Sequence, residues 1–178
     1  MSQSHSKSIT IANDPVLLAG IKQLMWAASD AIMAVYNSDD FGTEAKGDDS
    51  PVTKADLAAH NVLIKGLAAL TPEIPVVSEE DAASVKTGTS AIVYWLIDPL
   101  DGTKEFIKRN GEFTCNLALI EEKQTALGFV TVPAKGDLYI GGAQLPSTVE
   151  SQTTEPKLIK HNKSEGVTRV VASKSHLN

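Results

Sequence analysis

The first part of the chain carries two helical patterns of apolar residues separated by a polar stretch. Apolar positions recur at helical spacing over residues 14–37 and again over residues 53–71. The first pattern opens with an aspartate followed by Pro15, which is typical of a helix start, and Pro72 ends the second. Residues 38–51 are rich in Gly, Asp and Ser. The pattern therefore predicts two long amphipathic helices joined by a polar loop.

Beyond the second helix, the apolar residues occur in short runs typical of β-strands. We predict strands over residues 75–78, 92–97, 113–120, 125–132 and 138–141, the last three forming an antiparallel meander. Residues 81–90 are predicted to form a loop or a weak helix, and the polar residues 144–155 to form a connector. Two helices followed by a largely antiparallel sheet predict a layered α+β fold in which the helices pack on the sheet.

The last residues of the chain have the pattern of a strand that opens another structural unit. A lone strand over residues 168–172 can neither bury its apolar face nor pair its backbone. We therefore expect either that it joins the preceding sheet or that the chain is a shortened form of a longer protein. In the second case residues 1–160 form an N-terminal domain and residues 161–178 begin an incomplete C-terminal domain. An unfinished sheet edge would also favour self-association into a homo-oligomer.

The size and charge of the chain limit the classes of partner that it can bind. Its 178 residues, 42% of them hydrophobic and 21% charged, suffice for one domain with a substantial core. The net charge is −6 and Lys and Arg form no stripe, so we expect no nucleic-acid polymer as partner. A small nucleotide remains compatible with this charge, because a bound divalent metal can supply the positive field.

The sequence also indicates a compartment. No apolar stretch approaches the roughly 20 residues that span a bilayer, so we expect no transmembrane segment. The N-terminus is polar and lacks the apolar centre of a signal peptide. The single cysteine, Cys115, agrees with a reducing compartment. We therefore expect a cytoplasmic protein and leave open a loose attachment to the inner membrane.

Two carboxylates follow the apolar run that ends at residue 97. Asp98 comes directly after the run, and Asp101 precedes the pair Gly102-Thr103, which is typical of a helix start. Carboxylates and the intervening Leu100 carbonyl suit Mg²⁺, and N–H groups at a helix start suit phosphate. The structural alternative is that Asp98 caps the turn and Asp101 caps the helix.

A second acidic pair, Glu79-Glu80, also follows a short apolar strand. If this strand and the strand that leads to Asp98 are neighbours and end at the same edge of the sheet, their terminal carboxylates lie together. The alternative is that the pair is simply the charged start of a loop.

Asp56 allows two interpretations. With Thr53 it fits a capping box, which explains the residue completely in structural terms. The functional alternative is that Asp56 orients the hydroxyl of Thr103 so that it can accept a proton from an attacking water.

Other phosphate and metal motifs do not fit the spacing. A haloacid dehalogenase phosphatase requires Asp-x-Asp-Gly-Thr, whereas Pro99 stands two residues before Asp101. An EF-hand loop that begins at Asp98 would need glycine where Thr103 stands, and no P-loop motif occurs. The four histidines are not spaced as a zinc pair, so we expect them to be surface or helix residues. Cys115 is best explained as a core residue, because no histidine supports it as a nucleophile.

Taken together, these segments are similar to the motifs of one family. Residues 98–103 read Asp-Pro-Leu-Asp-Gly-Thr, residues 78–80 read Ser-Glu-Glu, and residues 46–56 read Lys-Gly-Asp-Asp-Ser-Pro-Val-Thr-Lys-Ala-Asp. The chain resembles the inositol monophosphatase superfamily of Mg²⁺-dependent, lithium-sensitive phosphatases. The continuation Lys-Glu-Phe-Ile over residues 104–107 resembles its 3′(2′),5′-bisphosphate nucleotidase branch. The resemblance implies the layered α/β fold of the sugar phosphatases.

The resemblance implies two metal positions. Glu79, Asp98 and the Leu100 carbonyl would hold one Mg²⁺, and Asp98 would bridge to a second that Asp101 shares. The family has a further motif, Trp-Asp-x-Ala-Ala-Gly, whose Asp completes the second metal position. This motif does not occur in the present chain.

The resemblance also implies how substrate is held and attacked. Thr103, oriented by Asp56, would position the attacking water near Glu79. The N–H groups of Gly102 and Thr103 would take the phosphate oxygens, and Asp101 would lie against the substrate together with Glu79 and Leu100.

The implied reaction is hydrolysis of the 3′-phosphate of 3′-phosphoadenosine 5′-phosphate to give AMP and phosphate, with a small phosphorylated nucleotide as substrate. Two alternatives stay open. One is an inositol phosphate or another sugar phosphate as substrate. The other, suggested by the missing motif, is an inactive fragment that only binds metal or associates with itself.

Overall fold

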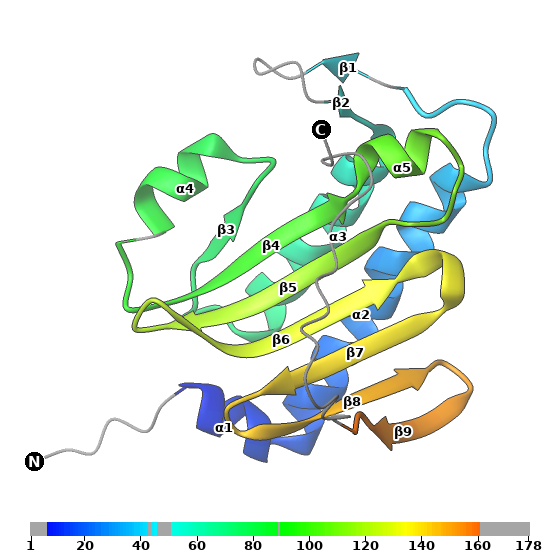
Figure 1. The fold of residues 1–178 in the computed structure, drawn as a ribbon. Coiled ribbons are helices and arrows are strands. Elements are labelled where there is room, and N and C mark those ends of the chain that lie inside the picture. The colour runs from blue at the N-terminus through cyan, green and yellow to red at the C-terminus, as the bar shows by residue number, and fades with distance from the viewer. Residues whose placement is uncertain (1–6, 43, 46–50, 89, 161–178) are drawn as a thin grey trace, which may run out of the picture.

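The computed structural model describes residues 7–42, 44–45, 51–88 and 90–160. Seven strands form one sheet in sequence order, and two long helices cover one of its faces (Figure 1). The strands are β3 (Val76–Ser78), β4 (Val93–Asp101), β5 (Thr114–Glu121), β6 (Gln124–Val132), β7 (Asp137–Gly142), β8 (Leu145–Ser151) and β9 (Thr154–Leu158). The helices are α1 (Lys7–Asn13), α2 (Pro15–Tyr36), α3 (Lys54–Leu70), α4 (Ala82–Gly88) and α5 (Thr103–Ile107), with a 3-10 turn η1 (Pro133–Lys135). A small separate sheet pairs β1 (Glu44–Ala45) with β2 (Pro51–Val52).

The two long helices begin where the sequence pattern predicts. Asp14 caps α2, because its Oδ1 accepts the N–H groups of Val16 and Leu17 at 3.0 Å each. Thr53 and Asp56 form a capping box at the start of α3. The inward faces of both helices and the adjacent face of the sheet form one core, with the buried residues Ile21, Met25, Ile32, Leu63, Leu67, Trp95, Ile97, Leu117 and Phe129. The predicted layered α+β fold is confirmed.

Helix α2 is more apolar than the sequence analysis anticipated. By length and mean hydropathy it is the one helix among the described residues that could cross a membrane. A core helix of a soluble protein passes the same test. Here Ile21, Met25 and Ile32 of α2 are fully buried in the core shared with α3 and the sheet, so the apolar face of α2 has a packing role.

The sheet is antiparallel except at one edge. From β4 to β9 each strand pairs antiparallel with the next, whereas the short edge strand β3 pairs parallel with β4. Helix α4 lies in the connection between β3 and β4, as a parallel pair requires a crossover. Residues 81–90, predicted as loop or weak helix, thus contain a short helix that serves this crossover.

The prediction of a connector over residues 144–155 is wrong, because this segment forms most of the hairpin β8–β9. The apolar alternation that normally marks a strand is missing here, since the inward position is Glu150 instead of an apolar residue. Glu150 is buried, and its Oε2 accepts from Nζ of Lys22 on α2 at 2.6 Å. A partly buried ion pair between the sheet and α2 therefore replaces the apolar contact that sequence reasoning looks for.

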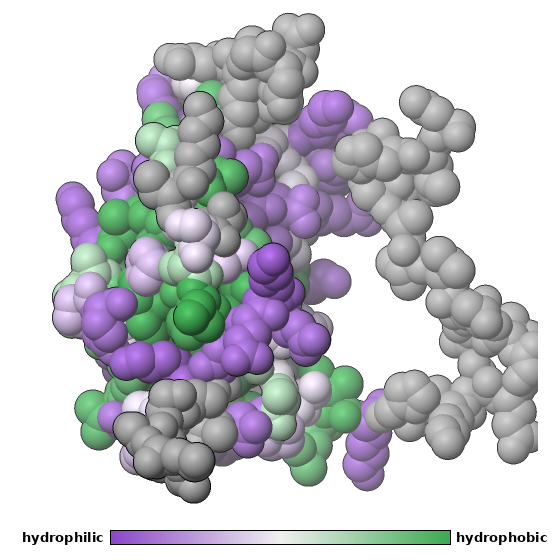
Figure 2. Space-filling model, turned by 90° about the vertical axis from the view of Figure 1, so that its left-hand side faces the viewer, coloured by the Kyte–Doolittle hydropathy of each residue, from purple (hydrophilic) through white to green (hydrophobic). Residues whose placement is uncertain are grey.

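The two faces of the sheet differ. The described helices α2 and α3 lie behind the sheet in Figure 1, while the opposite face presents Leu96, which is 40% exposed, and Tyr139, which is 38% exposed. Figure 2 views the side that carries α4 and β3 and shows apolar surface at its centre, with polar residues around it. Val85 of α4 and Ile92 before β4 are large exposed apolar residues in this part of the chain. The strand expected over residues 168–172 lies outside the described residues.

Candidate metal and phosphate site

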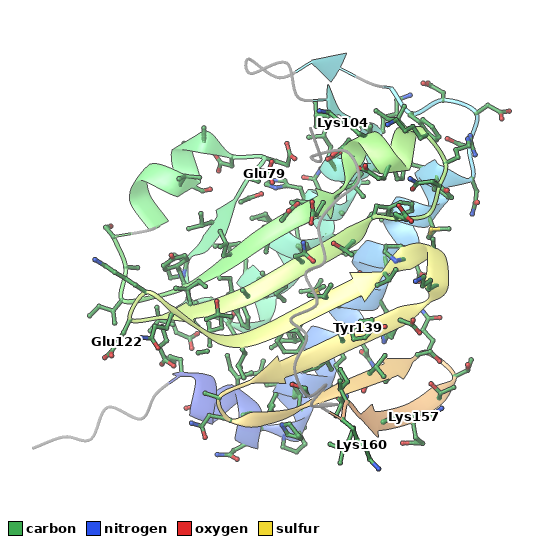
Figure 3. All side chains as sticks on the ribbon, viewed as in Figure 1. Glu79, Lys104, Glu122, Tyr139, Lys157 and Lys160 are labelled. Atoms are coloured by element: carbon green, nitrogen blue, oxygen red, sulfur yellow. The ribbon has the colours of Figure 1, made fainter. Side chains whose placement is uncertain are left out.

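The parallel pairing of β3 with β4 brings the two acidic turns to one edge of the sheet. Ser78 is in register with Ile97, and the N–H of Glu79 donates to the Ile97 carbonyl at 3.3 Å. Because both strands run in the same direction, Glu79 follows its strand at the level where Asp98 follows Ile97. Figure 3 shows Glu79 at the same end of the sheet as Lys104 of α5. The structure thus places the two predicted acidic turns side by side.

Strand β4 is longer than the strand predicted over residues 92–97, because it continues to Asp101 after an irregularity. Asp98 is in register with Asn116 of β5, and Asp101 with Thr114. Three steps along β4 therefore correspond to two along β5, which is a β-bulge that contains one extra residue. Pro99 lies in this bulge, where its missing N–H breaks no ladder bond. The bulge places Asp98 and Asp101 on one short, irregular segment.

Gly102 makes the turn from β4 into α5 possible. Its φ of 88° is left-handed, and a Cβ at this position would lie 2.9 Å from the carbonyl oxygen of Glu112. Glycine is therefore required here for both conformation and space. The Gly102 carbonyl accepts the N–H of Phe106 at 2.9 Å, so the predicted phosphate-binding residues Gly102 and Thr103 stand at the first turn of α5.

Asp56 combines both roles that the sequence left open. One carboxylate oxygen, Oδ2, accepts from the N–H and the hydroxyl of Thr53, each at 2.7 Å. The other oxygen, Oδ1, accepts from the Thr103 hydroxyl at 3.5 Å, and that hydroxyl also lies 3.2 Å from the Leu100 carbonyl. The buried carboxylate of Asp56 therefore caps α3 and reaches the start of α5 at the same time.

The carboxylates of the site lie close together and are partly or fully buried, and both features change their pKa values. Burial, and to a smaller extent the negative charges of Glu79 and Asp101, together raise the pKa of Asp98 to about 7. Burial also raises the pKa of Asp56, with a smaller contribution from the charge of Glu80, against the lowering effect of the hydrogen bonds from Thr53. These carboxylates disfavour one another's charged forms, and a divalent cation between them would relieve that repulsion.

The acidic side chains of the two turns lie at one edge of the sheet, but they are not arranged in the geometry of a metal site. Within the described part of the chain, no three His, Cys, Asp or Glu side chains are arranged so that they could hold a metal ion as they stand. The predicted donor set is Glu79, Asp98, Asp101 and the Leu100 carbonyl, all of them oxygen donors. Oxygen donors that carry several negative charges fit a hard cation such as Mg²⁺. Their assignment as metal ligands stays a prediction.

The sequence analysis missed residues that support this site. His60, one of the histidines expected to be a surface or helix residue, lies with its Nδ1 2.8 Å from the hydroxyl of Ser78, directly before Glu79. Arg109 donates to the carbonyls of Tyr36 and Ser38 at 2.8 and 2.6 Å and thereby ties the end of α5 to the end of α2. The spacing of His60 four residues after Asp56, on one face of a helix, could have suggested the role of His60. No such spacing indicates the contacts of Arg109 with the distant end of α2.

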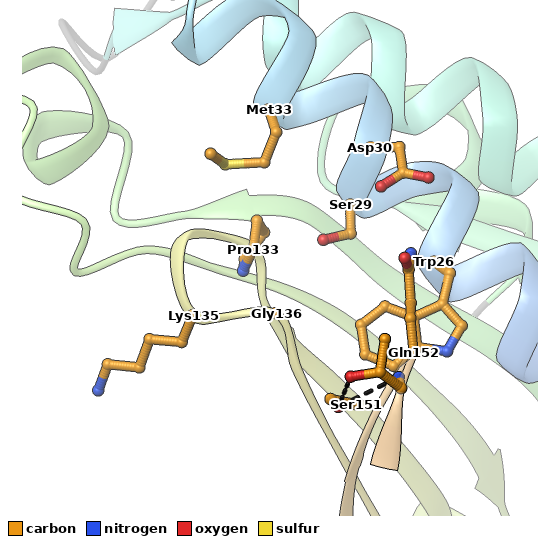
Figure 4. Close-up of a pocket in the computed structure, with 10 residues that line it drawn as sticks. Trp26, Ser29, Asp30, Met33, Pro133, Lys135, Gly136, Ser151 and Gln152 are labelled. Atoms are coloured by element: carbon orange, nitrogen blue, oxygen red, sulfur yellow. Dashed lines mark hydrogen bonds between the residues drawn. The ribbon is translucent and has the colours of Figure 1, made fainter.

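A cavity elsewhere in the molecule is separate from this site. It has a volume of about 290 Å³ and lies between α2 and the turns after β6 and β8 (Figure 4). Its lining includes Trp26, Ser29 and Asp30 of α2 together with Gly136 and Gln152. It shares no residue with the two acidic turns.

Comparison with known proteins agrees with the motifs. The model of the inositol monophosphatase family matches residues 13–177 of this chain. The match includes both acidic turns and the capping box of α3.

Individual relatives are similar over most of the chain. It is 52% identical over 124 residues to the 3′(2′),5′-bisphosphate nucleotidase CysQ of Salmonella typhimurium, covering 69% of this chain and 50% of the relative. Identity to the protein of the same name from Escherichia coli (strain K12) is 50% over 124 residues, with the same coverage. Identity to that of Haemophilus influenzae is 35% over 120 residues, covering 67% of this chain and 44% of the relative. The chain thus spans about half the length of the curated relatives it matches.

Solved structures show the same fold. CysQ from Bacteroides thetaiotaomicron, a bacterial member of the inositol monophosphatase family, matches with a TM-score of 0.61 and 34% identity, covering 86% of this chain and 53% of that one. The extragenic suppressor protein suhB from Bartonella henselae matches with a TM-score of 0.66 over 78% of this chain and 53% of that one. At 20% identity, the second match bears on the fold alone.

Proposed function

Since this chain belongs to the inositol monophosphatase family, we propose that it forms the metal- and phosphate-binding part of a Mg²⁺-dependent phosphatase. The observation that carries the proposal is the parallel register of β3 and β4, which sets Glu79 beside Asp98 at one edge of the sheet. In this proposal Glu79, Asp98 and the Leu100 carbonyl would hold one Mg²⁺, and Asp98 and Asp101 would contribute to a second position. Burial and the neighbouring negative charges raise the pKa of Asp98, and the contribution of those charges supports a cation at this place.

The remaining residues act on the water and the phosphate. Bound Mg²⁺ supplies positive charge to the phosphoryl oxygens and activates the attacking water. The Thr103 hydroxyl donates toward Asp56, which leaves its lone pairs to accept a hydrogen of that water. Burial of Asp56 raises the pKa of its carboxyl, which suits a group that takes up a proton. The N–H groups of Gly102 and Thr103 bind the phosphate oxygens.

As substrate we propose 3′-phosphoadenosine 5′-phosphate, hydrolysed at its 3′-phosphate to AMP and phosphate. The support is the 50–52% identity to bisphosphate nucleotidases, together with the continuation Lys-Glu-Phe-Ile after Thr103. An inositol phosphate or another sugar phosphate is the alternative substrate, as the family name allows.

An inactive chain that binds metal is the second candidate function. The chain spans about half the length of the curated relatives it matches, so hydrolysis by this chain is a proposal separate from metal binding. We also propose that residues 1–160 form one domain, which the end of β9 at Leu158 supports. A cytoplasmic location accords with the single cysteine, Cys115, and a homo-oligomer accords with an edge strand, β9, whose residues are all exposed.

The test is phosphate release from 3′-phosphoadenosine 5′-phosphate and from inositol 1-phosphate, with and without Mg²⁺, beside calorimetric titration of Mg²⁺. The proposal expects Mg²⁺-dependent release that is faster with the nucleotide. Faster release from inositol phosphate would replace the substrate assignment. Mg²⁺ binding without release from either would establish the metal-binding chain instead, and no Mg²⁺ binding at millimolar concentration would refute the site.

A further inference from the structure

We infer that His60 is a positioning residue for the metal site, because it fixes the turn of Glu79 and Glu80 through the hydroxyl of Ser78. The inference rests on the proposed function for what this turn binds. His60 itself reaches none of the predicted metal ligands with a described hydrogen bond, and its described partner is Ser78. Its effect is therefore expected on the geometry of the turn and not on the reacting atoms.

The hydroxyl of Ser78 links the imidazole to the acidic turn. Ser78 is fully buried, and its Oγ lies 2.8 Å from Nδ1 of His60. The same Oγ accepts the N–H of Glu80 at 3.2 Å. A serine hydroxyl can take part in both bonds at once, since it has one donor and two acceptor positions. The imidazole therefore fixes the rotamer of Ser78 that holds the Glu80 backbone.

Three successive N–H groups of this turn are held by three different parts of the molecule. That of Ser78 donates to the Ser84 hydroxyl of α4 at 3.0 Å, and that of Glu79 donates to the Ile97 carbonyl of β4 at 3.3 Å. The third, from Glu80, depends on the Ser78 hydroxyl and hence on α3 through His60. Loss of His60 would remove the link from the Ser78 hydroxyl to α3, while the attachments to α4 and β4 remain.

Helix α3 holds both acidic turns from one face. His60 follows Asp56 by four residues, so both side chains project from the same side of the helix. Asp56 reaches Thr103 after the β4 turn, and His60 reaches Ser78 before Glu79. A cation shared by Glu79 and Asp98 would have to match the separation of the two turns. Helix α3 thus helps to set this separation, together with the pairing of β3 with β4.

A purely structural role for His60 predicts a different result. If the bond to Ser78 only satisfies polar atoms, its loss lowers thermal stability but leaves Mg²⁺ affinity unchanged. If it positions the turn, affinity falls even in variants that remain folded, as is typical of residues that orient metal ligands. The two roles are separated by measuring Mg²⁺ affinity and thermal unfolding on the same samples.

The experiment compares His60→Ala, His60→Asn and His60→Gln by calorimetric titration of Mg²⁺. Asn places a polar atom near the position of Nδ1, whereas the Gln amide lies where Nε2 does and cannot replace the bond. Asn61→Ala is the matched control, because the Asn61 amide donates to the Leu57 carbonyl of its own helix at 2.8 Å and has no other hydrogen bond among the described residues. We expect His60→Ala and His60→Gln to weaken Mg²⁺ binding by about 10-fold, His60→Asn to restore most of it, and the control to match the unmodified chain.

Ser78→Ala provides a second, independent test of whether His60 acts through Ser78. Because His60 acts through Ser78, His60→Ala should cause no further loss of Mg²⁺ affinity once Ser78→Ala is present. Additive losses, or Mg²⁺ affinity within twofold of the unmodified chain in His60→Gln, would overturn the inference. If His60→Ala does not fold, the pair His60→Asn and His60→Gln still decides. Failure of the proposed function is recognisable separately, since the unmodified chain would then bind no Mg²⁺.

Discussion

The two acidic turns at the edge of the sheet are held by different kinds of contact. The turn after β3 is held by single hydrogen bonds from separate elements, namely His60 on α3, Ser84 on α4 and the backbone of β4. The turn between β4 and α5 is held by packing. The fully buried ring of Phe106 on α5 lies with its centroid 5.0–5.2 Å from those of Tyr36, Phe41 and Phe113.

Arg109 closes the packed turn from the solvent side. Its guanidinium carbon lies 4.6 Å from the centroid of the Phe41 ring, and its nitrogens donate to two carbonyls at the end of α2. Arg109 has a φ of 55°, an unusual backbone conformation that these contacts stabilise.

This difference in contacts indicates which of the two turns can change its position more easily. A buried aromatic residue contributes several kcal/mol, whereas a single hydrogen bond contributes about 0.5–1.5 kcal/mol net. The segment from Asp98 to Thr103 is therefore fixed by folding itself. The turn of Glu79 and Glu80 depends on weaker, directional bonds, and it is the half of the site that small changes can move.

The largest effect is expected from Asp98→Asn, which removes the acid at the centre of the packed turn. If the proposed function holds, Mg²⁺-dependent phosphate release should fall at least about 100-fold, or roughly 2.7 kcal/mol of transition-state stabilisation. The metal-free chain should become more stable at the same time. The pKa of Asp98 is raised to about 7 in the folded chain, so between about pH 4 and pH 7 the folded state holds a proton that the unfolded state has released.

Stability of the unmodified chain therefore falls as pH rises through that window, and Asn avoids the loss because it cannot ionise. We expect the melting temperature of Asp98→Asn to exceed that of the unmodified chain by about 5 °C at pH 8 and to match it near pH 4. Asp30→Asn, an exposed change on α2, is the control. Full activity in Asp98→Asn would contradict the assignment of the site.

The next largest effect tests the claim that packing fixes the second turn. Phe106→Ala should lower the free energy of unfolding by about 3–5 kcal/mol in urea denaturation, because it leaves a cavity among three rings. Phe106→Leu should lose less, since it fills part of the space, and it remains measurable if the alanine variant is unfolded. A loss below about 1 kcal/mol for Phe106→Ala would remove the distinction between the two turns.

A smaller effect is expected in the hydrogen-bonded turn. Ser84→Ala removes the acceptor of the Ser78 N–H and the donor to the Asp81 carbonyl, the latter at 2.6 Å. The free energy of unfolding should fall by about 1–2 kcal/mol, since a partly buried N–H loses its partner. Asn61→Ala should change it by less than about 0.5 kcal/mol. A loss as large as that of Phe106→Ala would show that both turns are held equally firmly.

The smallest change concerns Cys115, which reports on the core beneath Asp98. Burial, together with the charge of Asp98, raises the pKa of the Cys115 thiol to about 12. We therefore expect almost no reaction with iodoacetamide at pH 8 in the folded chain, and little change in Ser84→Ala. Labelling should accelerate in Phe106→Leu, whose core opens more often. Labelling is measured by mass spectrometry. Rapid labelling of Cys115 in the unmodified chain would contradict this description of the core.

Sequence reasoning recovered the parts of the fold that repeat a local pattern. The helices over residues 14–37 and 53–71 and the meander follow from caps and apolar spacing, which neighbouring residues determine. The hairpin over residues 145–158 was missed because its inward position is Glu150, whose partner Lys22 lies far away in the sequence. No local pattern can show that a charged residue of a strand will pair with a residue of a distant helix.

The same limit applies to the candidate site. The adjacency of Glu79 and Asp98 could be expected because two strands that end at one edge bring their last residues together. The double use of the Asp56 carboxylate and the bond from His60 to Ser78 could not, since each joins residues that touch only after α3 has packed on the sheet.

Strand β3 is attached to the sheet by three residue pairs, at its edge and parallel to β4. Parallel pairing through a crossover forms later than adjacent hairpins, because its contacts are distant along the chain. A cation shared by Glu79 and Asp98 could bind only after this strand has docked. By mass action, the concentration of that cation would then set how firmly the last piece of the sheet stays in place.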